Sequence, residues 1–480
     1  MIKKTPFLTG FPKALFGSKK RSIQDNIRSR RNKLAASGLS DFALLFQSFL
    51  AADFLVKISF NRRQRVYTEI VVFWAWLGQV LLFNESCTKA VSLVRSWCVA
   101  NDIQTPAADT SAYCQARKRL RLVFLQDVFS HISEVLNRRI RPQDRWKGMI
   151  IKSIDGSSVQ LMDTPENQEA YPQPTNQKKG CGFPVMGVAG VLNHAHGGWE
   201  GYVTSLHTEH DHKVAHRLLK YFHKGDLAIA DTAYSSYELI ARLKLKEVDS
   251  LMPHHQARKI DFRRGKKIGV NQRLSIWIKP KKQPKKSNLS KGEWDELPET
   301  MEIRIIRFWH EGRDGKLCRK HLVTTLLDTE KYPWEELASL YLERWDIELR
   351  FRDVKTTMGF EELNVKTPEM AQKALAMAMI GCNLIKAVSQ QAAELVDESI
   401  RKISFKGTLD EITSNSSSYR NHWRHPHKCT KLYLGLVGLV SDQLLNIRPF
   451  RHEPRAIKKR PKPFPRLTVP RGEWKNDTAA

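Results

Sequence analysis

The spacing of hydrophobic and polar positions divides the chain into a helical first part and a mixed second part. Residues 38–145 show helical periodicity, including one long predicted helix with the sequence AYCQARKRLRLVFLQDVF. From residue 149 onwards short buried runs take over: MIIKSID, VMGVAGVL, EGYVTSLH and DLAIADTAY are typical of strands, and YELIARLKL is typical of a helix. Strands that are followed by a helix, a strand and another helix predict an α/β fold.

The chain after residue 250 carries a different pattern. Between residues 250 and 330, LSIWI, MEIRIIRFW and KHLVTTLL are separated by basic, Pro-rich loops, which predicts an antiparallel β-insertion. The segment MAQKALAMAMIGCNLIKAV is almost entirely apolar and predicts a buried helix. Residues 401–450 favour further helices, and the many prolines after Arg451 exclude a regular helix there.

A run without proline or glycine, from Trp334 to Met358, predicts one long helix with a polar stripe. At about 100° per residue, four polar side chains fall within about 60° of one another: Tyr341, Arg344, Glu348 and Lys355. Apolar residues border the stripe on both sides: Leu342, Trp345 and Leu349 on one, and Ile347, Phe351 and Val354 on the other. This border predicts a polar strip at an opening in the core; an ion-paired, solvated helix surface is the alternative.

The charge of the chain indicates its partner. The 480 residues include 79 Lys and Arg against 50 Asp and Glu, a formal net charge of +29. We therefore expect a polyanion, and nucleic acid rather than a membrane, because the longest uncharged apolar run, Ile70 to Phe83, is shorter than the ~18–20 residues that span a bilayer. The seven cysteines are scattered without a CxxC motif, which fits a reducing cytoplasm.

Basic residues gather at both ends of the chain and on one predicted helix. Residues 1–37 form a basic arm, which is either solvated or in contact with DNA, and residues 451–480 form a basic, Pro-rich tail. Within residues 38–145, Arg117, Lys118 and Arg119 lie on the second of two helices, an arrangement that resembles a groove-reading pair. We predict a helical N-terminal DNA-binding domain in which these three residues contact DNA; an ordinary basic surface helix is the alternative.

Three acidic residues occupy positions that favour metal chemistry. Asp155 is predicted to end the first strand of the α/β unit, Asp231 ends a later strand, and Glu348 lies in the middle of the polar stripe. Three carboxylates that are brought together repel one another and need a cation, and their hard oxygens suit Mg²⁺ or Mn²⁺. Two such ions about 4 Å apart can drive phosphodiester displacement. Arg344 and Lys355 would then bind phosphates near them, and Tyr341 would stack on a base or bond a phosphate.

These residues match a known pattern. Tyr341, Arg344, Glu348 and Lys355 fit the Y-x2-R-x3-E-x6-K signature of the insertion-sequence-4 family of bacterial transposases. The segments IDGSSVQLMDTPEN and LAIADTAYSSYELI resemble the two Asp motifs of that family. The β-insertion and the tail segment PRAIKKRPKPFPRL also resemble it, so the similarity spans most of the chain, roughly residues 70–470.

The resemblance implies an RNase H-like catalytic core over residues 146–400, in which Asp155, Asp231 and Glu348 form a DDE triad that binds two Mg²⁺ or Mn²⁺ ions. It implies cut-and-paste transposition of double-stranded DNA, with nicking that frees a 3′-OH, strand transfer by that hydroxyl and, in several relatives, a hairpin intermediate. It also implies a homodimer bound to two transposon ends, working in the bacterial cytoplasm at the nucleoid, with Tyr341, Arg344 and Lys355 in contact with the DNA ends.

The sequence leaves some points open. Many relatives have an Arg directly after the second Asp, where this chain has Thr232. A stand-alone nuclease would use the same triad with water as the nucleophile, and a non-catalytic DNA-binding protein would need the basic surface alone. Trp277, Trp294 and Trp309 in the insertion are candidates for an aromatic side chain that stacks on a flipped base, with core packing as the alternative for each.

Overall fold

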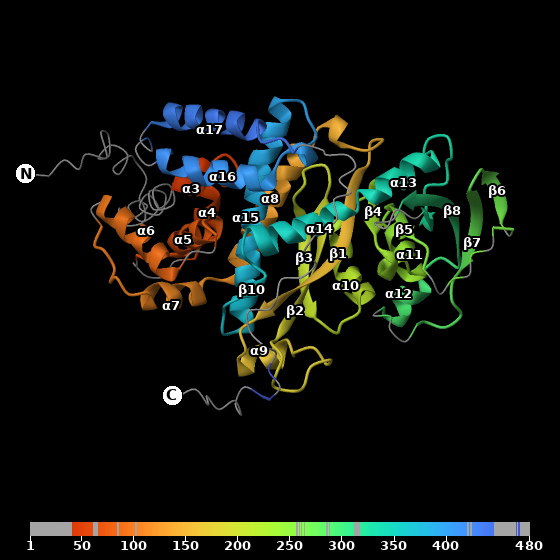
Figure 1. Cartoon of the computed structure of the whole chain (residues 1–480), viewed down its shortest axis with the longest axis horizontal. Helices are drawn as coiled ribbons and strands as arrows, with labels where there is room; N and C mark the ends of the chain where they lie inside the picture. Colours follow the sequence, from red (N-terminus) through yellow and green to blue (C-terminus); the bar gives the residue numbers. More distant parts are fainter. Residues whose placement is uncertain are drawn as a thin grey trace, which may run out of the picture.

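The computed structural model describes residues 41–445 with short gaps, the longest at 61–65 and 312–316, together with residues 467, 469 and 470. The expected basic arm (1–37) and almost all of the expected basic tail (451–480) lie outside the described residues. Figure 1 shows the helices of the first and last parts of the chain gathered at one end of an elongated molecule, with the sheet extending away from them.

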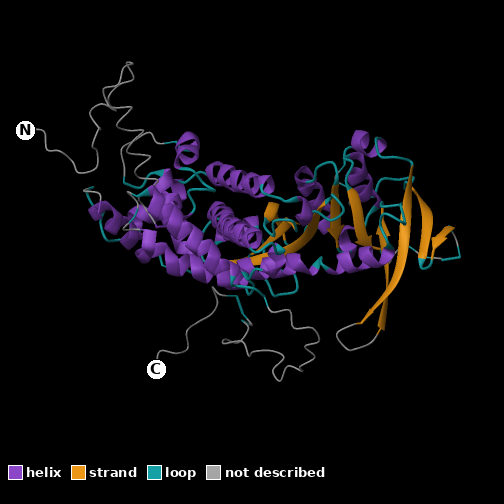
Figure 2. Cartoon of the chain, turned by 90° about the horizontal axis from the view of Figure 1, so that it is seen from above, coloured by secondary structure: helices purple, strands orange, loops and turns teal. Residues whose placement is uncertain are grey.

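The centre of the fold is a ten-stranded mixed sheet with the order β3-β2-β1-β4-β5-β9-β8-β7-β6, to which β10 adds beside β1. Its strands are β1 (Ile150–Leu161), β2 (Val185–Asn193), β3 (Trp199–Leu206), β4 (Asp226–Ala230), β5 (Asp249–Pro253), β6 (Lys266–Gly269), β7 (Gln272–Ile278), β8 (Thr300–Glu311), β9 (Leu317–Thr324) and β10 (Glu362–Leu363). Figure 2 shows the strands following one another in a single twisted layer. The mixed α/β class that the pattern predicted is therefore confirmed.

The sheet has a mixed half and an antiparallel half. β1, β2 and β3 pair antiparallel, and β4 and β5 join β1 in parallel. β9 then pairs antiparallel with β5, and β8, β7 and β6 follow by antiparallel pairing. The segment expected as a β-insertion thus continues the main sheet by hydrogen bonds instead of forming a sheet of its own.

Alternation of side chains along the strands assigns two faces to the sheet. On one face, Ile154, Ala228 and Ala230 pack with α10 (Asp211–Leu218) and α11 (Tyr237–Leu245). On the other face, Ile151, Leu227 and Ile229 pack with α13 (Trp334–Leu342). Because successive side chains point to opposite faces, the residues one position beyond Ile154 and Ala230 share the face that α13 covers.

A long buried helix, α15 (Pro368–Leu395), joins the helical end of the molecule to the sheet and confirms the apolar helix predicted there. Its side chains share one hydrophobic core with the first helices, the last helices and residues of β1 and β2. The remaining α-helices are α3 (Asp41–Leu45), α4 (Ala52–Ile58), α5 (Glu69–Leu81), α6 (Cys87–Ala100), α7 (Ser111–Arg119), α8 (Leu122–Arg138), α9 (Pro165–Ala170), α12 (Lys291–Asp295), α14 (Trp345–Arg352), α16 (Phe405–Ser416) and α17 (Pro426–Ser441).

Three predicted elements differ from the structure. The helix predicted from the segment AYCQARKRLRLVFLQDVF is two helices, because α7 ends at Arg119 and α8 begins at Leu122. The helix expected from Trp334 to Met358 is divided into α13, α14 and η4, a π-helical segment (Asp353–Thr357). β1 continues for six residues beyond Asp155, so this residue does not end its strand. The glycine after Asp155 could not reveal that β1 continues, because the continuation depends on pairing with β2 as far as Gln160.

Among the described residues, every helix is too short or too polar to cross a membrane.

Candidate active site

Asp155 and Asp231 lie side by side at the point where β4 ends. The parallel pairing of β1 with β4 ends with Ile154 opposite Ala230, so each Asp occupies the next position of its own segment. By alternation both carboxylates point to the face that α13 and α14 cover. Asp155 is therefore placed by the end of its partner strand, although its own strand continues.

Glu348 lies on α14 and, like Asp155, binds Arg344. A tight turn between α13 and α14 determines where α14 begins. Around Glu343 and Arg344 the backbone bonds run to the third preceding residue, as Arg344 N–H donates to Tyr341 O at 3.1 Å. Arg401, from a distant 3₁₀ turn, binds both sides of the turn between α13 and α14. Its Nη1 lies 2.6 Å from Glu343 Oε1, and its Nε lies 2.6 Å from Asp346 Oδ2.

Arg344 brings the acids of the strand and the helix together. Its Nη1 donates to Asp155 Oδ2 at 3.1 Å, and its Nη2 donates to Glu348 Oε1 at 3.2 Å. The Arg344 side chain is 9% exposed and that of Asp155 is 17% exposed, whereas Glu348 is open to solvent. One buried guanidinium therefore holds two of the three predicted catalytic carboxylates, and the third stands next to Asp155.

The electrostatics of Asp155 reflect this crowding. The pKa of its carboxyl is raised to about 6, chiefly by burial and also by the nearby carboxylates of Asp231 and Glu348, while the Gly156 N–H and the Arg344 guanidinium act to lower it. Asp155 Oδ1 accepts the Gly156 N–H at 2.8 Å. Asp231 Oδ1 accepts the Ala233 N–H at 2.9 Å and so also caps a short 3₁₀ turn, η3 (Thr232–Tyr234).

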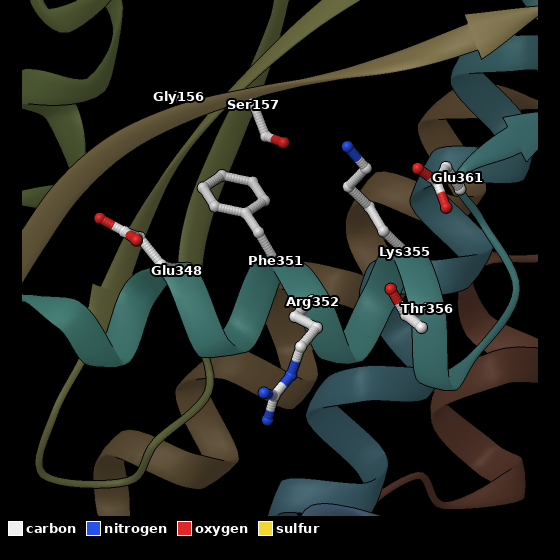
Figure 3. Close-up of a pocket in the computed structure, with 8 residues that line it drawn as sticks. All are labelled: Gly156, Ser157, Glu348, Phe351, Arg352, Lys355, Thr356 and Glu361. Carbon is white, nitrogen blue, oxygen red and sulfur yellow. The ribbon is translucent and has the colours of Figure 1, made fainter. Parts of the chain in front are cut away.

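A pocket of about 280 Å³ opens beside Glu348, and Lys355 stands on its wall. Figure 3 shows Lys355 extending between Ser157 of β1 and Glu361, while Arg352, which also lines the pocket, extends from the other side of the helix. Lys355 lies in the π-helical segment η4. The structure therefore places Lys355 on the same side of α14 as Glu348, within reach of a phosphate that enters the pocket.

Tyr341 and the apolar border of the stripe differ in their surroundings. Tyr341 is buried, and burial raises the pKa of its phenol within reach of Arg344, Asp231 and Asp155. Of the two apolar flanks that were expected, Ile347, Phe351 and Val354 are buried, but Leu342, Trp345 and Leu349 are exposed. The expectation of a stripe enclosed on both sides is therefore wrong for the flank of Leu342, Trp345 and Leu349. The site lies at the boundary between the core and this exposed apolar row.

The donor set of this site suits a hard divalent cation. Asp155, Asp231 and Glu348 offer carboxylate oxygens, the ligand type that Mg²⁺ and Mn²⁺ prefer. In the described part of the chain, no group of three His, Cys, Asp or Glu side chains is close enough to hold a metal ion without rearrangement. The Arg344 guanidinium lies between Asp155 and Glu348, so cation binding by both acids requires that side chain to move.

The three basic residues predicted on the second helix do not share one environment. Arg117 is half-buried, with its guanidinium 4.0 Å from the centre of the Trp76 ring and its Nη1 donating to Cys87 Sγ at 3.3 Å. Lys118 and Arg119 are exposed at the end of α7. These three residues therefore do not contact the acidic site, and the side chains of Lys118 and Arg119 are accessible to a binding partner.

The tryptophans of the insertion also separate by environment. Trp277 and Trp294 are buried, and the Arg258 guanidinium lies 3.6 Å from the ring centre of Trp277. Trp309 on β8 is 48% exposed, with the Arg307 guanidinium 5.4 Å from its ring centre. Among these three, Trp309 is the side chain that an external ring could reach.

Sequence reasoning missed Arg401 and a buried hydrogen bond behind the site. Ser153 and His194 are joined by a 2.6 Å hydrogen bond between Oγ and Nε2, and burial lowers the His194 pKa to about 4. His194 Nδ1 lies 4.0 Å from Asp346 Oδ2, which Arg401 also binds. These residues come from separate elements, so no spacing in the sequence could have revealed them.

Three comparisons bear on the identity of this site. Residues 146–384 match the family model described as "Transposase DDE domain". The chain is 25% identical over 413 residues to the transposase InsG for insertion sequence element IS4 of Escherichia coli (strain K12), covering 84% of this chain and 88% of that protein. It is 25% identical over 137 residues to the putative transposase InsZ of the same organism, covering 28% of this chain and 46% of that one.

A solved structure of the piggyBac transposase synaptic complex with hairpin DNA aligns with 87% of this chain and 88% of its own, at a TM-score of 0.43 and 10% identity. The match to the DDE domain covers all three predicted catalytic acids and the whole polar stripe, and the similarity to InsG extends over most of both chains. The chain therefore belongs to the DDE transposases of the insertion sequence 4 type.

Proposed function

We propose that this transposase cleaves DNA at the ends of its element and joins the freed ends to a target by metal-dependent phosphoryl transfer. Membership of the family makes DNA transposition its function. The cut-and-paste route, the catalytic triad of Asp155, Asp231 and Glu348, and the use of two Mg²⁺ or Mn²⁺ ions are our proposal. The mixed sheet, with three antiparallel strands followed by two parallel ones, supports an RNase H-like core for this chemistry.

The observation that carries the proposal is the convergence of acids around Arg344. Asp155 and Glu348 are 193 positions apart in the sequence, yet both bind this guanidinium, and Asp231 lies at the adjacent position of the sheet. An ion-paired helix surface alone would not require an acid from each of two neighbouring strands. This convergence supports a shared cation site, which would form once the Arg344 guanidinium moves out from between Asp155 and Glu348.

The three carboxylates would hold the cations, which supply Lewis-acid activation of the nucleophile and stabilisation of the leaving oxygen. The other side chains then have distinct tasks. Arg344, released from Asp155 and Glu348, can bind a phosphate bidentately, and Lys355 can bind a second phosphate as a point charge in the adjoining pocket. Tyr341 is buried beside Arg344 and would orient that guanidinium.

DNA would be bound by surfaces outside the site as well. The net charge of +29 supports a long electrostatic contact, in which Lys118, Arg119 and the basic arm and tail take part. We further propose that a homodimer brings two element ends together in the bacterial cytoplasm. Light scattering of the full chain with and without end DNA tests the dimer, because a particle with the mass of a single chain bound to a single DNA end would contradict it.

Cleavage and joining of a labelled element end in Mg²⁺ test the triad. We expect Asp155→Asn, Asp231→Asn and Glu348→Gln each to lower both products by at least about a hundredfold, while DNA binding persists. Glu335→Gln, at an exposed position of α13, is the matched control and should leave both products unchanged. Full activity in any of the three variants removes that residue from the triad. Cut product without joined product would identify a stand-alone nuclease.

A further inference from the structure

A fourth carboxylate lies against the strand that carries Asp155, on the opposite face of the sheet. Asp211 is the first residue of α10, and Tyr234 ends the short turn that follows Asp231. A methyl group placed on Gly156 would lie 3.7 Å from Asp211 Oδ1 and 3.6 Å from the Tyr234 hydroxyl oxygen. Both groups therefore converge on the backbone of the residue that follows Asp155.

The edge of β1 is open at this point, which allows groups from the two faces to meet. In the described residues, β4 pairs with β1 up to Ile154, and β10 pairs with it again from Gln160. Gly156 lies in this interval and has no side chain to separate Asp211 and Tyr234 from the strand edge. An α-helix that packs behind a complete pair of strands would have no such access to the acids on the other face.

The Tyr234 hydroxyl gives an independent sign of a ligand. Tyr234 is 1% exposed, and among the described residues its hydroxyl has no hydrogen-bond partner. A buried hydroxyl without a partner is unfavourable, so such a group indicates that a polar ligand reaches it in some functional state. Burial and the charges of Asp211, Asp155 and Asp231 raise its pKa well above the ordinary value, which keeps the phenol a neutral donor.

We propose that Asp211 is a fourth carboxylate of the divalent-cation site and reaches it over the open edge of β1 at Gly156. The ligand class is a hard cation, Mg²⁺ or Mn²⁺, and the Tyr234 hydroxyl is a positioning donor for the oxygens around it. The inference rests on the proposed metal-dependent function. Three carboxylates supply few of the oxygens that two such ions require, and Asp211 adds hard donors from a direction that the triad does not cover.

A purely structural role for Asp211 predicts something different. An acidic side chain in the first turn of a helix stabilises that helix through its dipole, and this contribution does not depend on a divalent cation. The two roles are separated by measuring cation binding and unfolding on the same variants.

The experiment is a Mn²⁺ titration of the full chain without DNA, followed by electron paramagnetic resonance, with thermal unfolding in chelator as the second readout. Asp211→Asn should weaken the binding of one ion by about tenfold or more, as loss of a supporting ligand does elsewhere. Asp155→Asn should lose most binding, and Asp127→Asn, at an exposed position of α8, should match the wild type. Tyr234→Phe should weaken Mn²⁺ binding while its melting temperature in chelator stays equal to or above that of the wild type.

Each outcome decides the inference. Wild-type Mn²⁺ affinity in both Asp211→Asn and Tyr234→Phe, together with weakened binding in Asp155→Asn, overturns the role of Asp211 and leaves the triad standing. A wild-type chain that binds no Mn²⁺, or whose binding Asp155→Asn does not change, overturns the proposed function and this inference with it. A fall in melting temperature with unchanged Mn²⁺ affinity assigns Asp211 to the helix alone.

Discussion

The guanidinium of Arg344 lies 3.1 Å from the carboxylate of Asp155, in the position where a cation shared by Asp155 and Glu348 would reduce their repulsion. The side chain that is proposed to bind DNA phosphate is thus the same one that neutralises the acids beforehand. Because a guanidinium and a divalent ion satisfy the same oxygens, they compete. If the proposed site binds a divalent ion, we expect cation binding by these acids to be coupled to release of Arg344 towards DNA.

Arg344→Ala tests this competition. Removal of the guanidinium should raise the Mn²⁺ affinity of the chain, because the acids lose a competing cation, while DNA cleavage falls at least about a hundredfold through the lost phosphate contact. Calorimetric Mn²⁺ titration and a single-turnover cleavage assay measure the two effects. Arg138→Ala is the control, since Arg138 is exposed on α8 and does not line the pocket. Weaker Mn²⁺ binding in Arg344→Ala would mean that Arg344 supports the cation site instead of competing for it.

The raised pKa of Asp155 predicts a pH-dependent stability of the cation-free protein. The folded chain holds the Asp155 proton up to a pKa of about 6, whereas the unfolded chain releases it near the ordinary value of 3.8. Between these values the folded state binds more protons, so its stability falls as pH rises through the window and stays lower above it. Asp155→Asn should remove this loss, which a shift of about two pKa units sets at up to roughly 3 kcal/mol.

Urea unfolding in chelator at pH 4 and at pH 7.5 measures the effect. The variant should be the more stable protein at pH 7.5, and most of its advantage should vanish at pH 4. Asp127→Asn, which changes an exposed Asp, controls for the general effect of charge removal. Equal stability of wild type and Asp155→Asn at both pH values would exclude a perturbed carboxyl at this position.

Arg401 is predicted to position the helix that carries Glu348. Its side chain is 40% exposed, so the loss of its ion pairs in Arg401→Met should cost no more than about 1 kcal/mol. Cleavage should fall more than that loss implies, because the turn between α13 and α14 is freed and Glu348 with it. The cleavage rate constant under saturating DNA is the measurement. Lys402→Met removes a neighbouring exposed ion pair and should leave the rate near wild type.

The tryptophans of the insertion should respond to substitution in opposite ways. Trp309→Ala should leave the melting temperature almost unchanged and weaken binding to element ends, by about 1–3 kcal/mol if the ring stacks on a base. Trp294→Ala should instead destabilise the fold by about 3–5 kcal/mol, because the ring is buried. Thermal unfolding and gel-shift titration on both variants separate the two roles. Unchanged DNA affinity in Trp309→Ala would exclude a contact there.

The basic end of α7 gives a similar contrast. Lys118→Ala and Arg119→Ala should each lower DNA affinity and reduce the slope of log affinity against log salt by about 1 if they contact phosphates. Arg117→Ala should chiefly lower stability, because its guanidinium packs on Trp76 and bonds Cys87. Salt-dependent fluorescence anisotropy measures the slopes. Equal slopes in all three variants and the wild type would place DNA elsewhere on the molecule.

Elements with a local sequence pattern could be predicted from the sequence, whereas features that depend on long-range contacts could not. Short buried runs predicted β2, β3 and β4, and a long apolar run predicted α15, because each of these patterns is local to its own segment. The division of α13 from α14 has no local signal, since it is held by Arg401, more than fifty residues further along the chain. Asp155 was expected at a strand end because glycine follows it, yet its position is set by where its partner β4 stops.

The hydrogen bonds between β5 and β9 have a mechanical consequence. A domain that is connected by flexible loops can rotate when it binds a ligand without displacing the rest of the protein. Here the four strands β6 to β9 continue the sheet through the hydrogen bonds between β9 and β5. The other neighbour of β5 is β4, the strand directly before Asp231. A displacement of strands β6 to β9 on binding DNA should therefore change the twist of the strands beside Asp155 and Asp231, because all of them belong to one hydrogen-bonded sheet.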